Sequence, residues 1–113
     1  MDNARDKEAT LEVIKKGSVE SLVVALRDRL GNISTLASVT NLKFDTKKKS
    51  DGSAVQSNAN AALDVDIPMS AICEIDTTLA GYVGGEEYKL YVKYTAGSES
   101  PILGPRFFRV EDD

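Results

Sequence analysis

The chain has 113 residues, of which 42% are hydrophobic and 28% charged, and its formal net charge is −4. These totals are typical of one soluble folded domain, and the negative balance gives no general attraction to nucleic acid or to an anionic membrane. No apolar run approaches the roughly 20 residues of a membrane helix, and residues 1–10 lack the apolar core of a secretory signal peptide.

The sequence has no histidine and a single cysteine, Cys73. An intrachain disulfide and a zinc site built from cysteine and histidine are therefore excluded. The commonest general base, which is also the usual partner of a serine or cysteine nucleophile, is missing as well. We therefore expect no enzyme activity, no catalytic residues and no cofactor.

Residues 1–9 are polar and charged, and we expect a flexible N-terminal arm followed by a single β-sandwich domain over residues 10–113. A first short strand is predicted from Leu11 to Lys15, ending at the turn signal Gly17-Ser18.

The stretch from residue 18 to residue 30 has two interpretations. Val19, Leu22, Val23, Leu26 and Leu30 follow helical spacing, which predicts an amphipathic helix and an α+β fold. The other interpretation is a strand in which Leu22, Val24 and Leu26 face inward and residues 28–32 form a turn. The adjacent β-branched residues at 23 and 24 favour this strand.

The middle of the chain predicts a hairpin and one further strand. Residues 40–45 alternate between apolar and polar side chains, and Asp51-Gly52 follows as a turn signal. Lys47, Lys48 and Lys49 are expected at a solvated hairpin tip. Residues 57–63 are small and polar, which fits an irregular loop or a weak strand, and residues 69–77 are expected to form a strand.

The clearest alternation runs from Tyr88 to Tyr94, where Leu90 and Val92 share a face with the two tyrosines. A turn-rich connection ends at Pro105, and residues 106–110 are predicted as the last strand. About seven short strands separated by turn signals predict an all-β, immunoglobulin-like β-sandwich.

Few residues suggest a catalytic, metal-binding or phosphate-binding site. Asp64, Asp66, Glu74 and Asp76 supply oxygen ligands, but they do not match the spacing of an EF-hand loop, so we expect no metal site. The glycines at 81, 84 and 85 do not match a phosphate-binding loop and are expected in turns. Cys73 is expected to be a buried thiol.

The order of motifs resembles a known family. The segments are KKG, then LRDRLGN, VTNLKFDTKKKSDG and AGYVGGEEYKLYVKYTAG, and finally SPILGPRFFRVED. Together they are similar to small immunoglobulin-like domains of tailed-bacteriophage virion proteins, among them the N-terminal domain of phage baseplate upper proteins. The resemblance covers roughly residues 11 to 110. Because the sequence ends at Asp113, we expect a stand-alone domain without the long C-terminal oligomerisation region of a baseplate upper protein.

The resemblance implies a non-enzymatic structural or assembly protein of a tailed-phage virion, as a capsid decoration, a head–tail connector or a tail accessory. Its partners would be other virion proteins and further copies of itself, not nucleic acid or a membrane. It would be made in the host cytoplasm and incorporated into the virion. We expect contacts through Tyr82, Tyr91, Arg106 and Arg109. The alternative is a module that binds carbohydrate or a host surface. The absence of tryptophan argues against it, because sugar-binding surfaces use aromatic rings for stacking.

Overall fold

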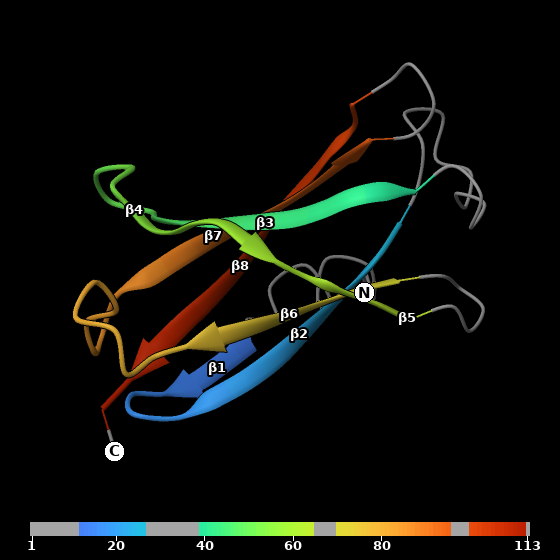
Figure 1. Cartoon of the computed structure of the whole chain (residues 1–113). Helices are drawn as coiled ribbons and strands as arrows, with labels where there is room; N and C mark the ends of the chain where they lie inside the picture. The colour runs from blue at the N-terminus through green and yellow to red at the C-terminus, as the bar shows by residue number, and fades with distance from the viewer. Residues whose placement is uncertain (1–11, 27–38, 65–69, 96–99, 113) are drawn as a thin grey trace, which may run out of the picture.

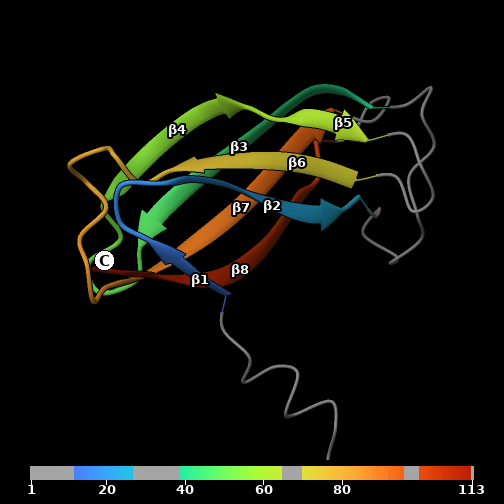
Figure 2. The same cartoon turned by 90° about the horizontal axis from the view of Figure 1, so that it is seen from below.

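The computed structural model describes residues 12–26, 39–64, 70–95 and 100–112, and the regular structure in these ranges consists of β-strands alone. Two sheets form a sandwich (Figure 1; Figure 2). The five-stranded sheet has the order β1 (Glu12–Lys15), β8 (Ile102–Glu111), β7 (Glu87–Thr95), β3 (Thr40–Lys48) and β4 (Ala54–Asn60). The three-stranded sheet has the order β2 (Val19–Ala25), β6 (Ser70–Asp76) and β5 (Ala62–Asp64). The all-β prediction is confirmed.

The strand order is that of an immunoglobulin-type sandwich. In that arrangement the strands named G, F, C and C′ lie side by side in one sheet, and B, E and D lie in the other. The order β8-β7-β3-β4 matches the first set and β2-β6-β5 matches the second. Strand β1 extends the larger sheet by pairing in parallel with the end of β8.

The stretch from residue 18 to residue 30 contains strand β2, so the helix alternative is wrong for residues 19–25. Strand β2 pairs antiparallel with β6 along its whole length. Leu22 and Leu26 are buried, whereas Val23 is 48% exposed. A helix would have placed Val23 on the buried side with both leucines, and the alternation of a strand separates them. Residues 27–30 lie outside the described residues.

Residues 54–60 and 62–64 form two strands, β4 and β5, whereas the sequence indicated a loop or one weak strand for residues 57–63. Strand β4 follows β3 through the predicted turn at Asp51-Gly52, and Gly52 has a positive φ of 76°. Strand β5 then pairs with β6 in the opposite sheet. The chain therefore changes sheets at Ala61, whose N–H donates to the carbonyl of Leu42. The described residues thus contain eight strands.

The C-terminal hairpin is confirmed, and its last strand is longer than predicted. Strands β7 and β8 pair antiparallel, with Glu87 opposite Arg109 and Lys93 opposite Ile102. The register shifts between Leu90 and Val92, close to the proline at position 105. Because proline lacks an N–H, this irregularity lets the strand continue past a residue that cannot donate to the ladder.

The core lies between the two sheets and contains a cluster of three aromatic rings. The ring centroids of Tyr82 and Tyr88 are 5.0 Å apart, and those of Tyr88 and Phe108 are 5.5 Å apart. The hydroxyl of Tyr88 accepts from the N–H of Val83 and donates to the carbonyl of Gly81. This tyrosine, near the start of β7, bonds back to the preceding connection as the tyrosine corner of immunoglobulin domains does. Cys73 is fully buried, as predicted.

Candidate functional site

Tyr82 does not lie on the surface, and its predicted role as a contact residue is wrong. Its side chain is 0% exposed. Its hydroxyl donates to Oε1 of Gln56 at 2.5 Å and lies 2.6 Å from Oγ1 of Thr46. Burial raises the pKa of Tyr82, although the hydrogen bond with Thr46 acts in the opposite direction. Tyr82 therefore fastens the connection before β7 to strands β3 and β4. The glycines around it led sequence reasoning to expect an exposed turn.

Arg106 is engaged within the chain. Its guanidinium contacts the carbonyl of Val23 and forms an ion pair of 2.7 Å with Glu12. These contacts connect β8 with β2 of the opposite sheet and with β1. We therefore assign Arg106 a bridging role between the sheets, since its donors are directed at groups of the same molecule.

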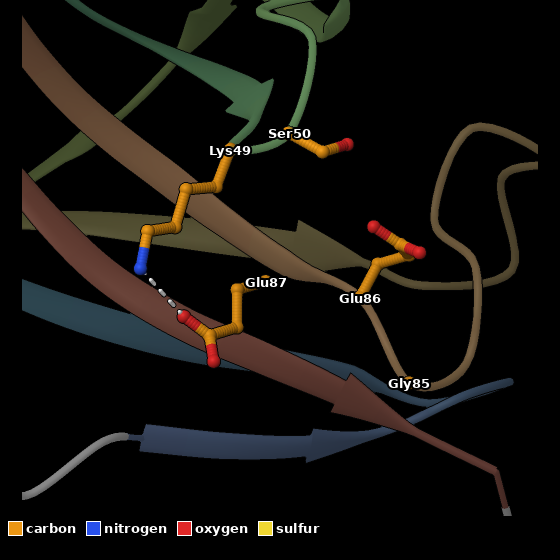
Figure 3. A pocket seen from close by; sticks show the side chains of 5 residues that line it. All are labelled: Lys49, Ser50, Gly85, Glu86 and Glu87. Atoms are coloured by element: carbon orange, nitrogen blue, oxygen red, sulfur yellow. Dashed lines mark hydrogen bonds and ion pairs between the residues drawn. The ribbon is translucent and has the colours of Figure 1, made fainter.

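A small depression lies at the end of the sandwich where the β3–β4 turn meets the start of β7 (Figure 3). The depression measures about 400 Å³ and is lined by Lys49, Ser50, Gly85, Glu86 and Glu87. Lys49 lies 3.1 Å from Glu87, and Arg109 lies 3.5 Å from the same carboxylate. The hydrogen bond from Lys49 lowers the pKa of Glu87. These charges are paired with one another, and we assign the depression no ligand.

The outer face of the five-stranded sheet is the most distinctive surface of the described residues. Because alternate residues of β3 and β7 are buried, the intervening residues point outward. The register places Lys43 opposite Lys93, Asp45 opposite Tyr91 and Lys47 opposite Lys89. We call these six residues the lysine face. Its two outer pairs are lysine pairs, and they flank one acidic and one aromatic residue.

The cross-strand lysine pairs are unfavourable for folding. Side chains directly opposite each other have Cβ atoms about 4.5–5.5 Å apart, and like charges at that distance destabilise a sheet. Among the described residues, Asp45 is the carboxylate that neutralises part of the charge, through an ion pair of 2.9 Å with Lys93. Lys47 and Lys89 have no carboxylate within 4.0 Å in the described part of the chain.

Asp45 is held in its charged form. Its partial burial acts to raise its pKa, but the hydrogen bond from the N–H of Asn58 and the ammonium of Lys93 outweigh that effect, and the pKa lies below the usual value. The centre of the lysine face therefore contains a fixed negative charge, which makes the surface a pattern of charges and not a uniform positive patch.

Aromatic side chains lie next to the lysines. The ammonium of Lys47 is 5.9 Å from the ring centroid of Tyr91, and that of Lys49 is 5.3 Å from the ring of Phe107. Phe107 is 38% exposed and lies opposite Lys89 in the register. Exposed aromatic residues are enriched at protein contact surfaces. Tyr91, which the sequence predicted as a contact residue, belongs to this surface, and the lysines were missed because only the register brings them together.

The two sheets carry opposite charge. The strands of the five-stranded sheet contain eight lysine and arginine residues and four acidic residues. The strands of the three-stranded sheet contain no lysine or arginine and four acidic residues, namely Glu20, Asp64, Glu74 and Asp76. The net charge of −4 therefore conceals a strong asymmetry between the two layers of the sandwich.

The described residues contain no cluster of three or more cysteine, aspartate or glutamate side chains placed to hold a metal ion, and Asp66 lies outside them. They also contain no helix long and apolar enough to cross a membrane.

A comparison of the chain with models of known protein families, with curated proteins and with solved structures finds no match.

Proposed function

We propose that this protein is a non-enzymatic assembly protein of a tailed-phage virion, acting through protein–protein contacts as a capsid decoration, a head–tail connector or a tail accessory. The observation that carries the binding role is the lysine face. Two lysine pairs directly opposite each other cost stability, and such a local conflict is typical of a functional surface. An acidic partner surface would remove the repulsion on binding.

The choice of a virion as the place of action is supported by the sequence resemblance to immunoglobulin-like virion proteins. The immunoglobulin-type strand order is compatible with that family, although the same fold serves many unrelated functions. On this proposal the protein is made in the host cytoplasm, and its partners are other virion proteins and further copies of itself.

Immunogold electron microscopy on purified particles of the phage that encodes the chain tests this proposal. Antibodies raised against the purified protein are expected to label the particles at one position, on the head, the neck or the tail. Protein that stays in the soluble fraction of the lysate, with unlabelled particles, would contradict the virion role.

A further inference from the structure

The outer face of the three-stranded sheet complements the lysine face. Residues of β2 and β6 that lie opposite each other there are Val23 with Ile72 and Ser21 with Glu74. Val23 is 48% exposed, Glu74 is exposed and Ile72 is half-buried. We call the outward residues Ser21, Val23, Ile72, Glu74 and Asp76 the acidic face. It combines apolar and acidic side chains, as the lysine face combines aromatic and basic ones.

We propose that the lysine face of one molecule docks on the acidic face of a second molecule of the same chain. The proposal deepens the proposed assembly function by naming one partner, a second copy, and the contact that holds it. Charged groups of opposite sign oppose each other across the contact. The exposed apolar side chains of Val23 and Phe107 supply area that excludes water.

The contact is head-to-tail, since it joins two different surfaces. These surfaces lie on opposite layers of the sandwich (Figure 1; Figure 2). A molecule bound through its lysine face therefore keeps its acidic face available for a third copy. Repetition of such a heterologous contact produces a ring when the rotation closes and a filament when it does not. Both are arrangements found along a symmetric particle.

The size of the smaller face makes this contact weak. Strands lie about 4.8 Å apart and rise about 3.4 Å per residue, so β2 and β6 with seven residues each and β5 with three cover about 280 Å². A stable interface buries about 800 Å² on each partner. We therefore expect dissociation of the free protein at micromolar concentration, and assembly where copies are held close together.

Sedimentation equilibrium of the purified protein tests the contact over a concentration series from about 10 μM to about 1 mM. In about 20 mM salt the weight-average mass should rise above the 12.2 kDa of the monomer as concentration increases. In about 0.5 M salt it should return to the monomer value, because the salt screens the opposed charges. A mass that stays at the monomer value throughout the low-salt series overturns the proposal.

Two charge reversals identify the surfaces involved. Lys89→Glu reverses one charge of the lysine face, and Glu74→Lys reverses one charge of the acidic face. Each variant alone should associate about tenfold more weakly or worse than the wild type, since like charges then meet. An equimolar mixture should recover dimers, because the intact acidic face of the first variant fits the intact lysine face of the second.

Each outcome has a defined meaning. Undiminished self-association of Glu74→Lys would exclude the acidic face as the partner surface and overturn the proposal. So would a chain that remains monomeric and binds a single-stranded oligonucleotide through Lys89, which would make the lysine face a nucleic-acid site. Circular dichroism of both variants controls for folding. The virion role is decided separately by immunogold labelling, so that either proposal can fail alone.

Discussion

Replacing one lysine of the Lys47–Lys89 pair by glutamate should make the folded protein more stable. Lys89→Glu converts a pair of like charges on adjacent strands into a pair of opposite charges. An opposite-charge pair on a sheet contributes about 0.2–1 kcal/mol and a like pair costs a similar amount. The free energy of unfolding should therefore rise by about 0.5–1.5 kcal/mol. For a domain of this size the melting temperature should rise by about 3–5 °C for each kcal/mol.

Urea unfolding at low and at high salt measures this gain. The gain should shrink in about 0.5 M salt, because both side chains are accessible to screening ions. The matched control is Lys47→Glu/Lys89→Glu, which places two glutamates opposite each other and should lose the gain. Equal stability of the wild type and both variants at low salt would refute the idea that the lysines repel each other. The lysine face would then lose its main support as a functional surface.

Three further predictions concern the interior and the fixed charge. Tyr82→Phe removes the hydroxyl shared with Gln56 and Thr46 and should lower the free energy of unfolding by about 1–2 kcal/mol in urea titrations; an unchanged midpoint would contradict this network. The pKa of Asp45 is lowered in the folded state, so its contribution to stability is present above its unfolded pKa of about 3.9 and is lost as the pH falls through the folded value. The wild type should therefore lose stability between about pH 5 and pH 2 more steeply than Asp45→Asn does, and parallel curves would refute the assignment. Burial raises the pKa of the Cys73 thiol to about 12. A thiol reagent at about pH 8 should therefore label Cys73 only at the rate at which the protein opens. Labelling of the folded protein as fast as that of the urea-unfolded chain would show that the core is open.

Strands with strict alternation and strong turn signals were predictable because these signals are local. Burial on alternate positions of β7 follows directly from the residues between Tyr88 and Tyr94, and the Asp51-Gly52 turn appears where it was expected. Residues 54–64 contain few large apolar side chains, so their local sequence does not favour a strand. They become β4 and β5 because β3 and β6 offer them hydrogen-bonding partners.

The choice between helix and strand for residues 19–25 also depended on distant residues. The spacing of Leu22 and Leu26 suits either structure. Pairing with β6, some fifty residues further along the chain, decided it. The same holds for Tyr82, whose neighbours in sequence are turn glycines, whereas its hydroxyl is satisfied by groups on β3 and β4.

The sequence by itself determined the class of the molecule, an all-β domain with a buried thiol at Cys73, because composition and alternation act within a few residues. It also pointed to Tyr91 as a surface aromatic residue. Only the tertiary structure placed Lys43 opposite Lys93 and Lys47 opposite Lys89, because the register between two strands about forty-five residues apart sets these pairs. The separation of basic and acidic residues onto opposite sheets arises in the same way, since it depends on which strands join which layer.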